Sequence, residues 1–387
     1  METGLPKTPP SSAPALDNLP AAETAKTQEV GIYGASQWQL IWMRFRRHKL
    51  AMLGGIVVLL IYLIALVADF LAPFAPDKFS STYTYAPPQT LNLFDDGQFS
   101  PYVYGYTSEV DPVALRRTFV LDETVKIPVR LFVEGAPYKL FGIIDTNIHL
   151  IGPVDPDQPM YLMGADRLGR DVFSRLLHGT RVSMFIGLVG VFFSLVLGVT
   201  LGGISGYYGG AVDNVIQRVI EFIRSIPTIP LWLGLAAAFP PEWGPLQIYF
   251  AITLLLSLIA WTGLARVVRG RFLSLREEDF VMAAKLDGIS QPRIIYRYML
   301  PAFYSHIIAS VTLAIPGTIL AETSLSFLGL GLRPPVVSWG VLLQEASNIR
   351  SVATAPWLLW PAVGVVVAVL ALNFLGDGLR DAADPYA

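Results

Sequence analysis

The sequence contains no cysteine and few charged residues. Without cysteine, a disulfide framework, a thiolate metal site and a cysteine nucleophile are all excluded. Aspartate, glutamate, lysine and arginine make up only 15% of the 387 residues, and the formal net charge is -2. The basic residues form no single stripe, so the sequence shows no nucleic-acid-binding surface. It also lacks a G-x-x-x-x-G-K-[ST] motif, which excludes a P-loop nucleotide site.

Apolar residues, in contrast, account for 53% of the chain and gather into six long runs. Because about 20 helical residues cross a hydrocarbon core of about 30 Å, each run is long enough to span a membrane. The runs cover residues 50–71, 182–204, 215–239, 248–268, 302–321 and 357–375. The sequence therefore predicts an all-α polytopic membrane protein with six transmembrane helices. Pro227 and Pro230 predict a kink in the third run, either as a simple bend or as a gating hinge.

The distribution of these runs predicts the organisation of the chain. Residues 1–40 are rich in Pro, Ala, Thr and Ser and are expected to form a disordered tail without a secretory signal. We expect the first transmembrane helix within 41–72, an outer insertion at 73–160, and a core with five spans at 161–387. Lysine and arginine before the first run and between the fourth and fifth runs place both termini in the cytoplasm. Four arginines, at positions 167, 170, 175 and 181, oppose this orientation, but they follow a long loop, for which the rule is weak.

Polar residues between the fourth and fifth runs predict a helical hairpin. Ser274 and Glu277 have the spacing of a capping box, so a first helix is expected at about 275–287, ended by Gly288. A second helix should run from after Ser290 to Pro301. On the first helix, one face should carry Phe280, Ala283, Ala284 and Asp287. By itself, this pattern is also typical of an interfacial connector between two spans.

The spacing Ala283-Ala284-x3-Gly288-x9-Tyr298-x-Leu300-Pro301 resembles the cytoplasmic EAA loop of ABC-type importer permeases. In that family this loop docks into a groove on the nucleotide-binding subunit. The sequence departs from the family pattern at Met282 and Tyr298, where the family has a glutamate and an aliphatic residue. The resemblance assigns ATPase coupling to a loop at 267–300, with Asp279, Phe280, Ala283, Ala284, Leu286, Asp287, Gly288, Leu300 and Pro301 as its functional residues.

Further segments resemble the C-type permease of dipeptide, oligopeptide and nickel importers. They are 163-MGADRLGRDVFSRLLHGTRVSM-184, 206-GYYGGAVDNVIQRVIE-221 and 321-AETSLSFLGLGLRPPVVSWG-340. The resemblance implies a type I ABC importer fold. The acids, arginines and glycines of 164–171 predict a tight, salt-bridged turn with a structural role. The structural motif residues are Gly164, Asp166, Gly169, Arg170, Asp171, Arg175, Gly206, Gly209, Gly210 and Asp213.

The 73–160 insertion is longer than we expect in a minimal permease of this branch. Alternating apolar residues at 125–131 predict a β-hairpin that turns at 134–137. Acidic residues outnumber basic ones across the insertion, which predicts a small β-containing subdomain with an acidic surface. It either receives the substrate-binding protein or packs on a partner permease.

The resemblance implies a transport subunit rather than an enzyme, in a bacterial inner membrane. Its partners would be a second permease, two ATPase subunits and an extracytoplasmic binding protein. No cofactor is expected on this chain, because ATP and Mg would bind the ATPase subunits. Peptides are the expected cargo, and oligosaccharides, opines or nickel chelates are the alternatives.

Glu322 is the clearest ionisable residue within an apolar run. Intramembrane acids are candidates for a transport path, although a structural role at the water interface is equally open. Ser326 and Pro227 are further candidates for the path or a gate. A secondary transporter is the rival hypothesis, but the halves show no convincing internal repeat. A membrane enzyme is also disfavoured, and no metal site is expected, because the four histidines lack ligand spacing.

Overall fold

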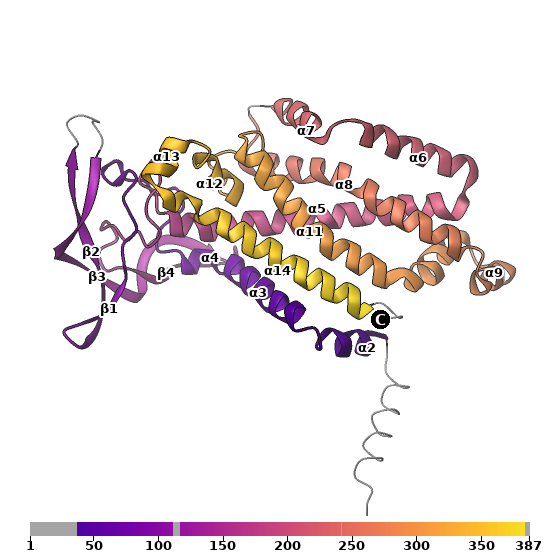
Figure 1. Ribbon diagram of the computed structural model, residues 1–387, viewed down its shortest axis with the longest axis horizontal. Coiled ribbons are helices and arrows are strands. Elements are labelled where there is room, and N and C mark those ends of the chain that lie inside the picture. Colours follow the sequence, from indigo (N-terminus) through magenta and orange to yellow (C-terminus); the bar gives the residue numbers. More distant parts are fainter. Residues whose placement is uncertain (1–36, 111–116, 241, 384–387) are drawn as a thin grey trace, which may run out of the picture.

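The computed structural model describes residues 37–110, 117–240 and 242–383, and most of these form an elongated helical bundle (Figure 1). The helices are α2 (Gln37–Phe45), α3 (Lys49–Leu66), α4 (Ala68–Leu71), α5 (Val172–Tyr208), α6 (Gly210–Ser225), α7 (Thr228–Ala237), α8 (Pro245–Leu275), α9 (Asp279–Leu286), α10 (Gln291–Ile294), α11 (Tyr304–Phe327), α12 (Trp339–Glu345), α13 (Ile349–Thr354) and α14 (Trp360–Ala383). Shorter 3-10 or π turns are η1 (Ser81–Tyr83), η2 (Ile295–Met299), η3 (Pro301–Phe303) and η4 (Pro356–Leu359).

Close helix packing builds the bundle around α5. Helix α5 packs along α8, and α11 lies between α5 and α14. Glycine makes the α5–α8 approach feasible, because a Cβ at Gly202 would lie 2.5 Å from the carbonyl oxygen of Ala265. In a membrane, such small residues let two backbones approach closely and gain van der Waals contact.

Five helical segments of the described residues are long and apolar enough to cross a membrane. They are Lys49–Leu66, Val172–Tyr208, Gln247–Leu275, Gln291–Phe327 and Pro356–Ala383. These segments correspond to the first, second, fourth, fifth and sixth spans expected from the sequence.

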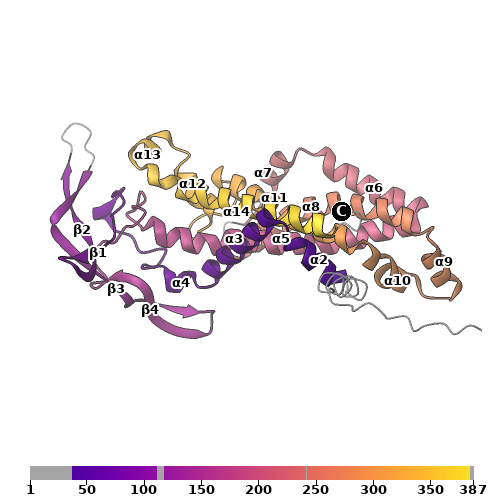
Figure 2. The ribbon, with the colours of Figure 1, turned by 60° about the horizontal axis from the view of Figure 1, so that its bottom comes forward.

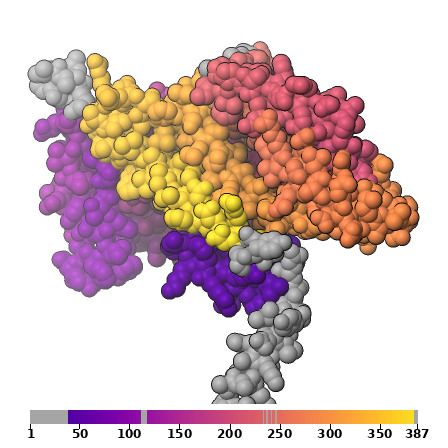
Figure 3. All heavy atoms as spheres, turned by 45° about the vertical axis from the view of Figure 1, so that its right-hand side comes forward, coloured from indigo at the N-terminus to yellow at the C-terminus, as the bar shows by residue number. Residues whose placement is uncertain are grey.

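The third expected span is not one continuous helix. It consists of α6 and α7, which are separated at Ile226 and Pro227. Ile226 has φ -85° and ψ 126°, the extended conformation that a following proline favours. Helix α6 is amphipathic, with Val215, Val219 and Phe222 exposed, and Figure 3 shows α6 and α7 covering one side of the molecule. The expected kink is therefore a complete break.

The expected tail at 1–40 is wrong for its last four residues, which are helical. Helix α2 begins at Gln37 and packs against α14 near the C-terminal end of that helix. Its Phe45 is buried with Ala51 and Ala382. The rest of the expected tail, residues 1–36, lies outside the described residues.

The insertion contains a four-stranded antiparallel sheet in the order β1-β2-β3-β4. Its strands are β1 (Asn92–Asp95), β2 (Gln98–Val110), β3 (Arg117–Leu140) and β4 (Ile144–Pro153). The sequence prediction of β structure is confirmed, but the turn expected at 134–137 is wrong. There the long strand β3 only shifts register against β4, and the chain turns at 141–143. Figures 1 and 2 place this sheet and α9 at opposite ends of the bundle.

Candidate functional site

Helix α9 stands at the end of the bundle farthest from the sheet and contains five of the nine expected coupling residues (Figure 2). Its C-terminus has the geometry of a Schellman motif. The amide of Gly288, which has φ +70°, donates to the carbonyl of Lys285, and the amide of Ile289 donates to that of Ala284. Glycine adopts this left-handed conformation without steric cost, so the sequence-based end of the helix is confirmed.

The expected start of this helix is wrong. Ser274 belongs to α8, and its hydroxyl donates to the carbonyl of Arg271 at 2.9 Å. Glu277 pairs with Arg276 instead of capping a helix. Helix α9 begins only at Asp279, because α8 continues the fourth span through Leu275.

The expected docking face of α9 also needs correction. Ala284 is 2% exposed and faces the chain's own core together with Val281. Phe280, Ala283 and Asp287 are exposed, and Leu286 is 87% exposed. The helical spacing that places Ala283 and Ala284 on one face did not reveal which of these two alanines points inward.

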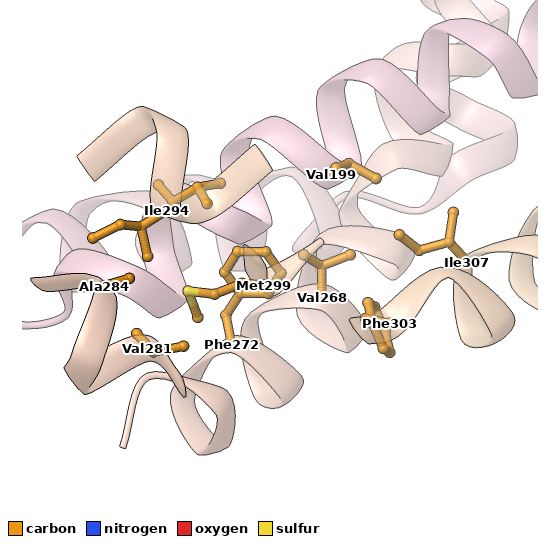
Figure 4. Close-up of a cluster of buried hydrophobic side chains, with 10 residues drawn as sticks. Val199, Val268, Phe272, Val281, Ala284, Ile294, Met299, Phe303 and Ile307 are labelled. Atoms are coloured by element: carbon orange, nitrogen blue, oxygen red, sulfur yellow. The ribbon is translucent and has the colours of Figure 1, made fainter. Parts of the chain in front are cut away.

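An apolar cluster fixes α9 to the bundle (Figure 4). Val281 and Ala284 of α9 lie in the same cluster as Phe272 of α8, Ile294 of α10 and Met299 of η2. The expected second helix is present as α10 followed by the π turn η2, and Leu300 packs against the cluster before Pro301 opens η3. The segment between the spans is therefore a packed unit that is joined to α8.

The 164–171 turn lies at the sheet end of the bundle and is salt-bridged as predicted. Asp166, which is 3% exposed, accepts hydrogen bonds from the backbone amides of Leu168 and Arg170. Its other oxygen lies 2.7 Å from Nε of Arg170 and 3.5 Å from Nε of Arg175. Gly169 has φ +68°, and a Cβ there would meet the carbonyl oxygen of Ser80 at 1.9 Å.

Two neighbouring contacts complete this turn. Gly164 also has a positive φ, and a Cβ there would lie 2.5 Å from the ring of Trp357, which donates to the carbonyl of Ala165. Asp171 caps α5 by accepting from the amide and hydroxyl of Ser174. Burial raises the pKa of Asp171 to about 6.

Internal pairing accounts for three of the four arginines that oppose the positive-inside pattern. Arg170 and Arg175 face Asp166, and Arg181 lies 2.7 Å from an oxygen of Asp69. Asp69 also contacts His178, at 3.1 Å. These side chains neutralise acids of the same chain, so they carry little information about orientation. Sequence reasoning missed Asp69, because it lies more than a hundred positions from its partners.

The 206–213 motif joins α5, α6 and α8 at the opposite end of the bundle. A Cβ at Gly206 would lie 2.8 Å from the carbonyl oxygen of Arg269, so only glycine permits this helix contact. Gly209 and Gly210 have positive φ and turn the chain from α5 into α6. Asp213 then receives two hydrogen bonds of 2.5 Å from Arg269 and another from Ser205. The motif residues therefore fix a helix junction.

A groove of about 520 Å³ lies among α5, α8 and α11. Its lining is apolar or small, with a few hydroxyls, and includes Ser194, Leu256, Gly263, Ala314, Gly317 and Thr318. Sequence reasoning did not select these residues. A signal was available, because Ser310, Ala314, Gly317 and Ala321 of α11 recur at helical spacing and are all small.

Glu322 is completely buried and does not line this groove. Its Oε1 accepts from the hydroxyls of Ser326 and Ser338, each at 2.8 Å. Ser326 in turn accepts from the amide of Leu332. These bonds hold the segment leading into α12 against α11. Pro227 is exposed at the break between α6 and α7.

Comparison with known families and proteins gives a consistent result. Residues 198–386 match the binding-protein-dependent transport system inner membrane component, and residues 36–88 match the N-terminal transmembrane domain of oligopeptide transport permease C. The dipeptide transport system permease protein DppC of Lactococcus lactis is 32% identical over 370 residues, covering 93% of this chain and 94% of its own length. The oligopeptide transport system permease protein OppC of Haemophilus influenzae is 37% identical over 257 residues, covering 66% and 80%.

A solved structure of the MetNI methionine ABC transporter, in an inward-facing conformation, is also similar. It is 19% identical, with a TM-score of 0.43, and the match covers 54% of this chain and 96% of the other.

Proposed function

The chain belongs to the family of binding-protein-dependent transport system inner membrane components, and we propose that it is a permease subunit of an ATP-driven peptide importer. The observation that carries this proposal is its similarity to the DppC and OppC permeases along most of the chain. Di- and oligopeptides are the cargo, delivered by an extracytoplasmic binding protein. Nickel chelates, oligosaccharides and opines are less well supported, because the similar relatives are named for peptides.

The exposed surface of α9 is the coupling surface for an ATPase subunit. It presents Phe280, Met282 and Leu286 to solvent, while the apolar cluster fixes the opposite side of the helix. Exposed apolar side chains on a rigid helix suit docking into a groove of a partner. ATP and Mg bind that partner, because this chain has no P-loop motif.

The groove among α5, α8 and α11 forms this chain's half of the translocation path. Its lining includes small and hydroxyl-bearing residues and no charged side chain. The groove therefore leaves room for the extended backbone of a peptide. A second permease closes the open side of the groove. Glu322 braces the segment between α11 and α12 at the border of the path, through its bonds to Ser326 and Ser338.

In this proposal both termini and α9 face the cytoplasm of a bacterial cell, and the sheet faces the binding protein. ATP-driven closure of two ATPase subunits shifts α9 and the packed segment beneath it. Because that segment is continuous with α8 and α11, the movement reorients the helices that line the groove.

Two substitutions at exposed positions, Leu286→Asp and Ile349→Asp, test the coupling surface. Leu286→Asp should abolish co-purification of the ATPase subunits and peptide uptake, since a charge without a partner disfavours an apolar interface. Ile349→Asp is the matched control, because Ile349 is 83% exposed but belongs to α13, near the sheet. It should leave ATPase co-purification unchanged. If both variants bind the ATPase subunits equally, the coupling surface is refuted. If added peptides do not compete for uptake, peptides are not the cargo.

A further inference from the structure

Two hairpin turns among the described residues of the sheet have similar backbone conformation but opposite chemistry. Asp96 and Gly97 connect β1 to β2 with φ of 47° and 82°. Phe141 and Gly142, with φ of 54° and 73°, begin the three-residue connection from β3 to β4. Aspartate or asparagine before glycine is the usual choice where both residues have positive φ, because a bulky side chain is disfavoured there. The second turn therefore carries an aromatic residue at a position where a polar one is expected.

Apolar side chains surround this second turn and point away from the protein. Phe141 is 50% exposed, Ile143 is 82% exposed and Ile144 is 55% exposed. The nearest charges, Lys139 and Asp145, pair with each other across the strands at 3.6 Å. The turn is thus an exposed apolar tip whose adjoining charges neutralise one another.

The β3–β4 hairpin lies beside the helix that follows the first span. The ring of Phe132 in β3 lies against that of Phe70 in α4, with centroids 6.2 Å apart and the ring planes tilted by 40°. The ring of His149 in β4 lies 3.0 Å from the carbonyl oxygen of Asp69. Figure 2 shows the hairpin running along α4, with its turn directed back toward the helical bundle.

Two lengths along the chain show how far the tip of this hairpin reaches beside α3. Ile144 lies five residues beyond His149, which is about 17 Å of extended strand. The membrane-spanning helix α3 ends at Leu66, three residues before Asp69, which is only about 4.5 Å of helix. The tip can therefore reach the level at which the apolar, outward-facing side of α3 begins. Exposed leucines at 59, 60 and 63 continue that side into the membrane.

We propose that residues 140–144 insert into the interfacial region of the bilayer leaflet on the side of the sheet. The occupant of this apolar surface is lipid because the tip is continuous with the lipid-facing side of α3 and carries no unpaired charge. Aromatic and aliphatic side chains are stable at this depth, where the polar groups of the backbone still meet water. The insertion would hold the sheet in a fixed tilt against the helical bundle.

The absence of native cysteine allows a direct test with single-cysteine variants. Ile143→Cys and the matched control Asp96→Cys are labelled with a fluorophore in the full chain, reconstituted in phosphatidylcholine–phosphatidylglycerol nanodiscs. We expect spin-labelled lipid to quench the label at 143 severalfold more strongly than the label at 96. A water-soluble quencher should show the reverse order. Neither substitution removes a buried contact, so both variants should fold.

Two results would overturn the proposal. If the water-soluble quencher reaches both labels equally, the tip projects into solvent. If the label at 143 is shielded from the soluble quencher and from spin-labelled lipid alike, protein covers it instead of lipid.

Discussion

The 164–171 turn and the α9–α10 segment both look in sequence like short polar motifs between apolar runs, yet they are built in opposite ways. In the turn, Asp166 and Arg175 are buried and face each other, and glycines admit the neighbouring backbone. In the α9–α10 segment the charged residues are exposed, and the apolar residues divide between two sides. Val281 and Ala284 are buried in the cluster, whereas Leu286 is exposed. The charges of the first motif pair with one another and hold the turn together. The second is held by buried apolar side chains, and its charged residues remain at the surface.

Removal of Asp166 should produce the largest loss of stability. Asp166→Ala leaves the buried Arg175 without its acid, and breaking one partner of a buried ion pair typically costs about 3–5 kcal/mol. Thermal unfolding of the purified protein in detergent measures the effect. Arg218→Ala, which removes the exposed ion pair with Glu221, is the control and should cost less than about 1 kcal/mol. Similar unfolding temperatures for the two variants would mean that the turn does not brace the bundle.

Substitution of Gly288 should affect the α9–α10 segment alone. Nothing lies within 4 Å of a Cβ at this position, so only the left-handed backbone opposes a side chain. Gly288→Val should cost about 1–2 kcal/mol locally and re-aim α9, whereas Gly288→Asn should be tolerated because asparagine adopts this conformation more readily. The expected result is lost peptide uptake with Val and retained uptake with Asn, at equal membrane insertion. Full uptake with Val would show that the orientation of α9 is unimportant.

These two motifs also show how far the sequence could predict the structure. Gly288 and Gly169 were predictable, because a helix end and a tight turn each require a conformation that glycine adopts readily. The inward direction of Ala284 was not, because it depends on Ile294 and Met299, which reach it only after the chain has folded back. Periodicity identifies a face of a helix, but it does not say which face the rest of the chain covers.

The same limit applies to the insertion and to the groove. Alternation in 125–131 correctly predicted a strand, but the turn was misplaced, since Gly135 and Pro137 resemble turn residues and lie at a register shift. The apolar Phe141-Gly142 turn gave no comparable polar signal. The groove joins three helices from distant parts of the sequence, so no local pattern could define it.

The smallest effect is expected at Asp171, the buried cap at the start of α5. Its pKa is raised to about 6, above the unfolded value of about 3.9, so its protonated form is the one favoured by folding. This contribution to stability is complete below about pH 4 and is lost as the pH rises to about 6. Asp171→Asn keeps the oxygen that accepts from Ser174 and should change stability at pH 7 by no more than about 1 kcal/mol.

The variant therefore should differ from the native chain mainly in its pH dependence. Between pH 4 and pH 6 the native protein should lose stability relative to Asp171→Asn, because only the native chain must place a charge in a buried site. Unfolding temperatures measured across this range, with the exposed Asp96→Asn as a control, provide the comparison. If Asp171→Asn and Asp96→Asn follow the native curve in parallel, the carboxyl group of Asp171 does not titrate in this interval, and the cap is ionised throughout.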